Sequence, residues 1–511
     1  MNRWWYQTTT ALLRLFLLVS QCQAWSKSAP NIVIVGGGPC GLFLAATLLK
    51  QNQELGKNYN IHVLEKQARQ GQPVNAFGMG LSPRMVKTLE ALDPELSDRV
   101  LSVGQLTDIG GQHQKQYPGF EFRIAQRQDI CQQMVGYIED TFASEVKEGR
   151  FQISYDEGCE SVDFEEKTVT TSQGRNIHYD LLVAADGINS KIRQQLVAND
   201  DSNDWTVEQY YNKFRAWKAL ELPPQSFLVP GTFQRFMHPS FFCQILPRYP
   251  EGHIGLMFYA APEMDNGDDK RNPVGINTAE ELKQAMTQTL LETTVDEGKS
   301  ETKRRLDPLK GFRKIMGMKG EKDRSGLLVE KDEERQVVFN DEALEHFVQS
   351  RPGRSQVMKI NRYHDSKASV ALIGDAAHGM YSLLGQGCAC GLQNTKILGE
   401  TLQQQSSDLA SALEAYSEQA VPEGHAITDL NLVSHAFASK KKLKFLPSMI
   451  WNNLRGKGLM QNVGRHDIPY TKLLKQNRAI VKVAKEEWGN ARIPVPVSPK
   501  VPPATNSKVL S

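Results

Sequence analysis

The sequence predicts an α/β protein with a parallel sheet, to which an antiparallel sheet and C-terminal helices are added. Three apolar runs carry the prediction, because each leads into glycine and acidic residues. The first precedes Gly36-Gly37-Gly38-Pro39-Cys40-Gly41, the second Asp186-Gly187 and the third Gly374-Asp375. Such runs are typical of buried parallel strands, and ligands bind outside the carboxyl ends of these strands. A ligand site is therefore expected where the three segments meet.

The first run begins a Rossmann-like βαβ unit. Asn31 to Val35 is the predicted strand, and Leu42 to Leu49 lacks helix breakers. In such a unit Gly36 makes the tight turn, Gly38 lets the backbone approach a pyrophosphate, and Gly41 lets the helix pack on the strand. The helix N-terminus would then face the phosphates. A glycine turn that binds nothing is the alternative.

The next predicted strand, Ile61 to Leu64, ends on Glu65. A carboxylate at this place can hold the ribose hydroxyls of an adenosine. Glu65 follows the glycines at a slightly long distance, and we interpret the polar stretch Gln51 to Asn60 as an extended turn between helix and strand. The unit thus predicts a site for the ADP half of a dinucleotide.

The other two signals extend this site. The predicted strand before Asp186-Gly187 lies within Asp180 to Ser190, although Asp-Gly after a strand is often a plain turn. Ala368 to Ile373 leads into Gly374-Asp375, and the stretch from Gly385 opens a helix that runs to about Gln403. A carboxylate beside a helix N-terminus offers an acceptor for a ribityl chain and N–H groups for isoalloxazine carbonyls. The three signals together predict a flavin site.

These motifs resemble the class A, single-component FAD-dependent monooxygenases of the aromatic hydroxylase type, over about residues 31 to 435. Within that family the chain is similar to kynurenine 3-monooxygenases. The similar stretches are Gly80-Leu81-Ser82, Gln126-Arg127-Gln128-Asp129-Ile130, Asp180 to Ser190, Tyr363 to His378 and Pro422 to Leu430.

The resemblance implies that Gly36, Gly38, Gly41 and Glu65 hold the ADP half of FAD, and that Arg127 contacts its phosphates or ribityl region. Further implied FAD contacts are Pro39, Lys66, Gly374, Asp375, Gly385, Gln386, Gly387, Cys388 and Ala389, with Asp375 at the ribityl hydroxyls. The Asp186-Gly187 segment would support both FAD and transiently bound NAD(P)H. Two alternatives stay open: Arg127 as a surface arginine near Asp129, and His378 as a packed residue without chemistry.

The reaction implied by the resemblance is the cofactor's own. NAD(P)H reduces FAD, O₂ adds at flavin C4a, and the hydroperoxide hydroxylates or epoxidises a small aromatic or olefinic substrate. No catalytic base is assigned. An FAD-dependent dehydrogenase or reductase without oxygen insertion is one alternative. A non-enzymatic binding protein on the same fold is another, which the complete set of Gly36 to Gly41, Glu65, Arg127 and Asp375 disfavours.

Several positions depart from the pattern of the resembled family. Ser382 stands where a proline is usual, and Ala389 where kynurenine enzymes have an asparagine. Leu106 to Gly111, in the region after the Leu-Ser motif, contains no arginine, and Tyr117 is the one plausible aromatic partner there. A desolvated carboxylate needs a charged or bidentate partner. The departures disfavour kynurenine itself as substrate.

Composition fits a globular enzyme with two to three domains. The chain has 511 residues, a net charge of +2 and 23% charged residues, which is ordinary globular usage and predicts no nucleic-acid affinity. A single Gly-rich fingerprint favours NAD(P)H binding without its own Rossmann domain. The seven cysteines lack zinc spacing, and we expect no metal. Cys388 and Cys390 are expected to pack rather than to form a redox dithiol.

The antiparallel sheet is predicted from Phe214 to Leu222, Phe241 to Leu246 and His253 to Tyr259, with Phe236, Phe241 and Phe242 as candidate walls of a substrate pocket. A charged, largely helical segment follows from Thr278 to Lys322 and is assigned no chemistry. The expected domains are an FAD-binding domain in two parts (25–203 and 361–435), a substrate domain (204–360) and a C-terminal helical region (436–492). A targeting segment (1–24) precedes them and a Pro-rich tail (493–511), extended or disordered, follows.

The targeting segment has Arg3 before the apolar stretch Ala11 to Val19 and small-residue cleavage geometry at Cys22-Gln23-Ala24. We expect it to direct the chain into the secretory pathway, to a plastid or the endoplasmic reticulum rather than to secretion. The segment Lys440 to Trp451 combines lysines with apolar residues. It predicts peripheral membrane contact, or alternatively a helix end that covers the FAD domain.

Overall fold

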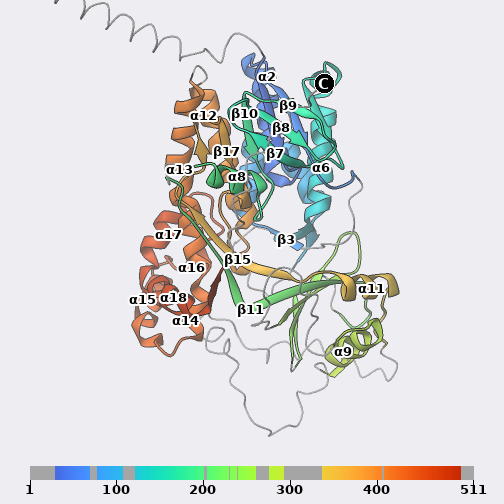
Figure 1. Ribbon diagram of the computed structural model, residues 1–511. Coiled ribbons are helices and arrows are strands. Elements are labelled where there is room, and N and C mark those ends of the chain that lie inside the picture. The colour runs from blue at the N-terminus through green and yellow to red at the C-terminus, as the bar shows by residue number, and fades with distance from the viewer. Residues whose placement is uncertain are drawn as a thin grey trace, which may run out of the picture.

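The protein is described here by a computed structural model, which covers residues 29–69, 78–107, 121–200, 204–228, 231–238, 240–259, 276–292, 336–405 and 408–495. An α/β part, an antiparallel sheet and a group of C-terminal helices make up the fold (Figure 1). The predicted targeting segment, Tyr117, most of the charged segment after Glu292 and most of the Pro-rich tail lie outside the described residues.

The α/β part is built on a six-stranded sheet in which five strands are parallel. Its order is β16 (His364–Asp365), β17 (Val370–Leu372), β10 (Leu181–Ala184), β1 (Asn31–Val35), β2 (Asn60–Leu64) and β6 (Phe151–Ser154), and only β16 is antiparallel. Strands β1, β10 and β17 are almost fully buried, because both faces of the sheet are covered there. The predicted fold class is confirmed.

Helices and a small sheet cover the two faces. The helices of the α/β part are α2 (Pro39–Leu55), α3 (Pro83–Leu92), α4 (Pro94–Ser102), α6 (Arg127–Thr141), α7 (Ala143–Lys147), α8 (Lys191–Ala198), α12 (Gly387–Gln404) and α13 (Leu409–Leu430), with short 3-10 turns η3 (Gly374–Ala376) and η4 (Ser382–Leu384). The small antiparallel sheet comprises β7 (Cys159–Asp163), β8 (Thr168–Thr171) and β9 (Asn176–His178). All of these layers share one hydrophobic core.

The turn between α2 and β2 is shorter than predicted. Helix α2 continues to Leu55, so much of the polar stretch Gln51 to Asn60 is helical and not an extended turn. The first two side chains of this stretch are buried, and their amide N–H groups are hydrogen-bonded: Gln51 Nε2 donates to Gly399 O (2.9 Å), and Asn52 Nδ2 donates to Tyr59 O (3.0 Å). Buried amides that are hydrogen-bonded cost the helix little.

The second large sheet is antiparallel. Its order is β12 (Gln234–Met237), β13 (Phe242–Pro247), β14 (His253–Tyr259), β11 (Val207–Leu222) and β15 (Gly353–Ile360), and β18 (Arg492–Pro494) also pairs with β11. Helices α9 (Ala279–Glu292) and α11 (Asp341–Gln349) cover one face. The other face packs against the three-stranded sheet β3 (Gly78–Leu81), β5 (Arg123–Gln126) and β4 (Gln105–Leu106), which lies between the two large sheets (Figure 1).

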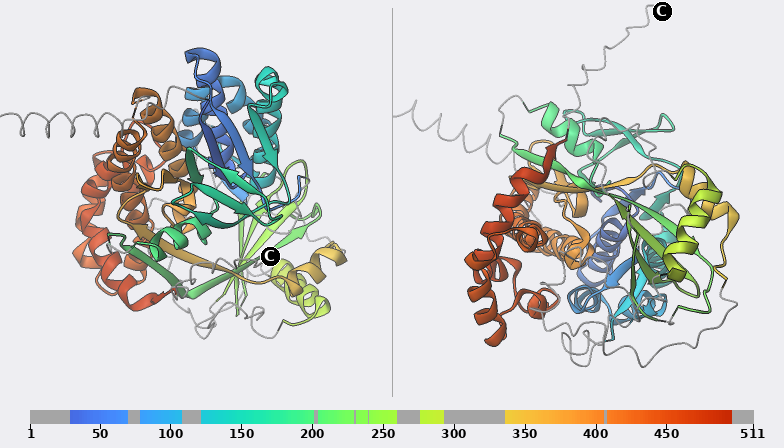
Figure 2. Two further views of the ribbon diagram at one scale, coloured as in Figure 1. Left: turned by 45° about the horizontal axis from the view of Figure 1, so that its top comes forward. Right: turned by 90° about the horizontal axis from the view of Figure 1, so that it is seen from below.

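The C-terminal helices form a third hydrophobic cluster. They are α14 (Val433–Ala438), η5 (Lys442–Lys444), α15 (Leu446–Leu454), α16 (Leu459–Asn462), α17 (Tyr470–Gln476) and α18 (Arg478–Ala491). Figure 2 shows these helices, in orange and red, along one side of the molecule. Strand β18 then returns the chain to β11, so the first residues of the predicted tail belong to the sheet.

Candidate active site

The glycine loop after β1 has the close approaches that only glycine permits. Gly36 has φ 116°, and a Cβ atom there would lie 2.3 Å from Ala185 O at the end of β10. A Cβ atom on Gly41 would lie 2.1 Å from Gly36 O. Helix α2 begins at Pro39, and no side chain caps its N-terminus. The loop therefore brings a helix N-terminus and free backbone to the edge where the parallel strands end.

Glu65 holds this loop through its side chain. Its Oε2 accepts from Gly37 N (2.8 Å), and its Oε1 accepts from Gln67 N (2.9 Å). Lys66 beside it is exposed and contacts the backbone region of Gly158. Glu65 thus fixes the geometry of the loop, and its role as a ribose ligand stays a prediction.

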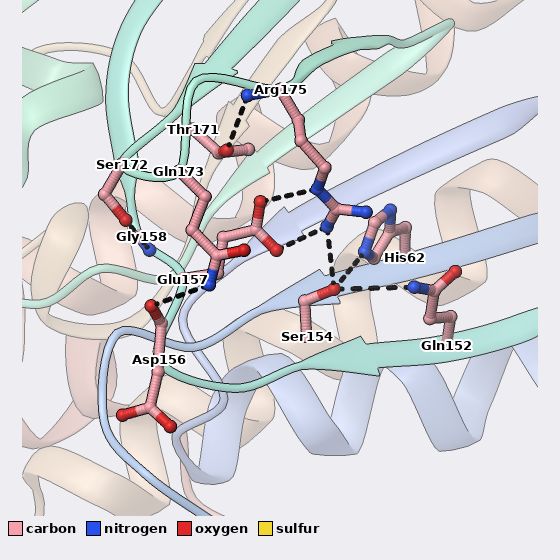
Figure 3. Close-up of polar contacts among 10 residues, drawn as sticks. All are labelled: His62, Gln152, Ser154, Asp156, Glu157, Gly158, Thr171, Ser172, Gln173 and Arg175. Carbon is pink, nitrogen blue, oxygen red and sulfur yellow. Dashed lines mark hydrogen bonds and ion pairs between the residues drawn. The ribbon is translucent and has the colours of Figure 1, made fainter.

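A polar network behind Glu65 supports the same segment (Figure 3). Glu157 is 2% exposed, and its carboxylate accepts from Nε (2.8 Å) and Nη2 of Arg175, which lowers its pKa. Arg175 also donates to Ser154 Oγ (3.0 Å), which contacts His62 Nε2 (2.9 Å). Because Glu157 N donates to Glu65 O (2.9 Å), the network fixes the backbone at Glu65. Sequence reasoning missed it.

Arg127 is the first residue of α6 and lies over the glycine loop. A Cβ atom built on Gly38 would lie 2.9 Å from Arg127 Nη2. The side chain is exposed. Asp129, its proposed surface partner, has a pKa that burial raises and that the charge of Arg248 lowers. Arg127 therefore lies beside the glycine loop, and its contact with the FAD phosphates or ribityl region stays a prediction.

Asp375 lies in η3, directly after β17. The residue is accessible to solvent. Desolvation by the surrounding protein nevertheless raises the pKa of its carboxyl group, and the positive charge of Arg127 partly opposes this rise. The preceding Gly374 has φ 57°, and a Cβ atom there would lie 2.9 Å from Cys40 Sγ of α2. The third segment thus meets the first one, which is the convergence that the sequence predicts.

The segment that opens α12 is tied to the C-terminal helices. Gly385 has φ 62° and requires glycine. Gln386 is buried; its Nε2 donates to Leu384 O (3.2 Å) and its Oε1 accepts from Tyr470 OH (3.0 Å). Only the backbone of Gln386 is therefore free for a ligand. Gly387 follows with open space around its Cα, and Ala389 is buried.

The two cysteines of this helix point to different surroundings. Cys388 is partly exposed, and its pKa is raised by burial and by the nearby Cys40, Cys131 and Asp375. Cys390 is buried, with Sγ 3.6 Å from His378 Nε2. Residues two apart on a helix do not share a face. The two cysteines are therefore placed to pack against their surroundings, as expected, and not to form a redox dithiol with each other.

His378 is fully buried. Burial lowers its pKa to about 4, so the ring is neutral at ordinary pH. Its ring packs near Tyr363 with centroids 6.0 Å apart. The open alternative of a packed residue without chemistry is therefore favoured.

Asp186 caps helix α8 at this edge. Its Oδ2 accepts from Lys191 N (2.8 Å) and Ile192 N (3.4 Å), and burial raises its pKa. Its Oδ1 is buried without a hydrogen-bond partner in the described part of the chain. Gly187 has φ 84° and open space beside it. This carboxylate therefore holds the first turn of α8, and its contact with the cofactor stays a prediction.

Two buried arginines at the site were not predicted. Arg193 of α8 donates to Ala376 O (3.0 Å) and Ile188 O (2.7 Å), which joins the Asp186 and Asp375 segments. Arg84 lies two residues after Ser82 of the Leu81-Ser82 motif. The adjacency to that motif was a signal for Arg84, whereas no local pattern marks Arg193.

Arg84 is committed to the C-terminal helical region. It donates to Val463 O (3.3 Å), Ile468 O (2.6 Å) and Gln393 Oε1 (3.1 Å), and its guanidinium lies 3.9 Å from the Tyr470 ring centroid. It is 1% exposed. An arginine in this state is not available to a substrate carboxylate.

The three candidate pocket phenylalanines lie on opposite faces of the antiparallel sheet. Phe236 and Phe241 are 4% exposed and belong to the core under α9 and α11. Their prediction as pocket walls is wrong, because side chains alternate along a strand and these two point away from the α/β part. Phe242 points to the other face and stacks on Phe258, with ring centroids 5.8 Å apart.

Comparison with known proteins agrees with this geometry. Residues 30–305 match the family model described as FAD binding domain. The chain belongs to this family of FAD-dependent monooxygenases. It is an FAD flavoprotein of the class that uses NAD(P)H, as predicted.

Curated relatives of similar length are distant. The chain is 24% identical to kynurenine 3-monooxygenase of Phaeosphaeria nodorum over 447 residues, which cover 83% of this chain and 82% of that enzyme. It is 21% identical to the Saccharomyces cerevisiae enzyme of the same name, over 89% of this chain and 94% of that one. The enzyme of that name from Caenorhabditis briggsae matches more closely, at 40%, but only over 72 residues, 14% of this chain and 16% of its own length.

Solved structures share the fold. Tetracycline destructase Tet(51) aligns with a TM-score of 0.54 and 15% identity, over 86% of this chain and all of that one. A tetrameric 2-methyl-3-hydroxypyridine-5-carboxylic acid oxygenase aligns with a TM-score of 0.52 and 17% identity, over 83% of this chain and 96% of that one.

The residues at the converging segments fit FAD. The N-terminus of α2 has no side-chain cap, Arg127 supplies a cation beside Gly38, and Asp375 supplies an accessible carboxylate. In the described parts of the chain no group of three or more potential metal ligands occurs. There is also no helix there with the length and apolar character that crossing a membrane requires.

Proposed function

We propose that this enzyme uses NAD(P)H and O₂ to hydroxylate or epoxidise a small aromatic or olefinic substrate. Bound FAD would supply the electron transfer and the oxygen activation. The residues of the chain would bind and orient it: Gly36, Gly38, Gly41 and Glu65 at the ADP half, Arg127 at the phosphates and Asp375 at the ribityl hydroxyls. The remaining predicted contacts, from Gly374 and Gly385 to Ala389, would contribute mainly backbone groups.

The observation that carries the proposal is an apolar, aromatic sheet face that packs on the β3–β5–β4 sheet, whose strand β5 leads directly into Arg127 of α6. Phe242 and Phe258 stack on this face, and Trp217 packs there with Ile254 and Leu256. Arg248, at the end of β13, lies close enough to lower the pKa of Asp129 in the first turn of α6. That turn begins at Arg127. An apolar wall beside the cofactor would bind a ring or an alkene and exclude water.

A substrate without an amino-acid head fits this site best. Arg248 is paired with Glu221 (2.8 Å), and Arg84 donates to backbone carbonyls and to Gln393. A substrate carboxylate would have to compete with these partners, and an unpaired buried carboxylate is costly. Kynurenine, the substrate named for several relatives, is therefore disfavoured here.

The test is coupled turnover under ¹⁸O₂. Purified full-length protein with FAD is given NADPH and a panel that contains kynurenine and neutral aromatic and prenoid compounds. We expect a neutral compound to accelerate NADPH oxidation and to yield a product that carries one ¹⁸O atom. If NADPH oxidation is recovered entirely as hydrogen peroxide or as a reduced product with every compound, the reductase alternative replaces this proposal.

A further inference from the structure

The C-terminal helices carry an exposed surface that combines apolar and basic side chains. Its apolar members are Leu443 (86% exposed), Ile450 (49%), Trp451 (56%) and Leu454 (77%). Its basic members are the exposed Lys440, Lys444, Arg455 and Lys457 and the half-buried Lys442. We call these nine residues the basic apolar surface. They lie on η5, α15 and the adjoining turns, and α15 is at the outer edge of the molecule (Figure 1).

Helix α15 is anchored by one face and leaves the other uncovered. Phe445, just before the helix, is fully buried, and Met449 is 7% exposed in the cluster shared with α14 and α18. Ile450, Trp451 and Leu454 point outward from this anchored helix. The alternative in which this segment covers the FAD domain is therefore not what the described residues show. Scattered exposed apolar residues are common, but four large ones on one short segment mark an interaction site.

The charge of this segment is of one sign. From Asn431 to His466 the sequence contains no Asp or Glu. Lys441 is neutralised by Glu486 (3.0 Å) and Glu487 (3.3 Å) of α18 and is therefore left out of the surface. The guanidinium of Arg455 lies 4.5 Å from the Trp451 ring centroid, so cation and aromatic ring are presented together.

We propose that the basic apolar surface binds an anionic lipid bilayer peripherally. Tryptophan and leucine side chains enter the boundary between head groups and acyl chains, while lysines pair with anionic head groups. An acidic protein would complement the lysines but gives no reason for four exposed apolar side chains around them. A purely apolar partner would not explain why the surface carries several lysines and arginines without acidic residues beside them. This inference does not depend on the proposed function.

The test is cosedimentation of the full-length FAD-loaded protein with vesicles. One set contains phosphatidylcholine with phosphatidylserine, and the other contains phosphatidylcholine alone. We expect binding to the anionic vesicles only, with the affinity falling as salt is raised. Replacing Lys440, Lys442 and Lys444 by Gln should weaken binding on the order of 100-fold. The double variant Trp451→Gln/Leu454→Gln should also abolish sedimentation.

Matched controls use the same chemical changes elsewhere. Leu55→Gln removes an apolar side chain that is 46% exposed at the end of α2. Lys147, Lys283 and Lys367 are exposed lysines on other elements and can be changed to Gln together. Both controls should bind like the wild type. Equal binding to the two vesicle types, no binding to either, or equal losses in the controls would overturn the proposal. So would variants that change only the oligomeric state, since that points to a second copy as the partner.

Discussion

Individual residues at the site support the fold in addition to the cofactor contacts proposed for them. Glu65 is the clearest case, because the carboxylate expected to hold a ribose also accepts from Gly37 N and Gln67 N. Arg127 is different. It lies over Gly38 at the surface of the site, so its removal should affect a ligand more than the fold.

Arg127→Gln should weaken FAD binding on the order of 10- to 100-fold, the usual loss for a charge-assisted hydrogen bond. Arg127→Lys should fall between this variant and the wild type, because lysine keeps the charge but not the fork geometry. The measurement is the FAD dissociation constant of the apoprotein from quenching of flavin fluorescence. Arg150→Gln is the matched control, since Arg150 lies at the amino end of β6, away from the site. Equal losses in both variants would contradict the assigned role.

His378 should make stability depend on pH. Its pKa in the fold, about 4, is below the ordinary 6.5 of the unfolded chain. As pH falls from about 6.5 to about 4, the unfolded state gains a proton and the folded state does not. The free energy of unfolding should therefore fall over this range by up to about 3 kcal/mol from this residue, with no further loss below it.

The check is urea unfolding of His378→Gln and the wild type between about pH 7 and about pH 4. The difference in stability between the two proteins should shift in favour of the variant as pH falls. His466→Gln, a change at an exposed histidine, should follow the wild type. A constant difference between His378→Gln and the wild type would show that the histidine is not buried in its neutral form.

The residues that were predicted are marked by their near neighbours in the sequence, whereas the contacts of those that were missed are not. Gly36, Glu65 and Asp375 were predicted because each follows its own strand within a few residues. Arg193 and Arg84 were missed because their partners lie 183 and 379 residues away in the sequence. The Leu81-Ser82 motif marks the position of Arg84 in the sequence, but no periodicity or motif records the distant contacts of either arginine.

At the scale of elements, the spacing between β1 and α2 depends on a single position. Gly41 faces Gly36 O so closely that any side chain must push helix and strand apart. The glycine loop and the start of α2 would move together, and both belong to the site.

Gly41→Ala should destabilise the protein by about 1–3 kcal/mol, the usual cost of overpacking, and should weaken FAD binding as well. Gly489→Ala in α18 is the same chemical change at an exposed helical glycine with open space around it. It should stabilise the protein by about 0.5–1 kcal/mol. Melting temperatures of both variants with and without FAD provide the measurement. A Gly41 variant as stable as the wild type would contradict the close packing.

Most elements that form the site could be predicted from local pattern. Strands β1, β2, β10 and β17 are short apolar runs, and α12 begins where the glycines predict. The small sheets β3–β5–β4 and β7–β8–β9 were not predicted, because their strands are short and only partly buried. Local pattern also could not predict which side chains of the antiparallel sheet face the core, since this depends on where α9 and α11 pack.

The whole molecule is held together around the edge where the parallel strands end. Met358 of β15 exchanges backbone hydrogen bonds with Gly379 (2.9 and 3.0 Å), which joins the antiparallel sheet to the segment after His378. Arg84, Gln386 and Tyr470 connect α3 and α12 to the C-terminal helices. All three parts of the fold therefore contribute to the surroundings of one site.

The central claim is that this site holds FAD for reaction with NAD(P)H and O₂. The most direct test is the absorbance spectrum of the purified full-length protein, recorded before and after anaerobic addition of NADPH. We predict flavin bands that bleach slowly with NADPH alone and faster when a neutral aromatic or prenoid substrate is present, and that return on admission of air. A colourless protein that cannot be reconstituted with FAD would contradict the account.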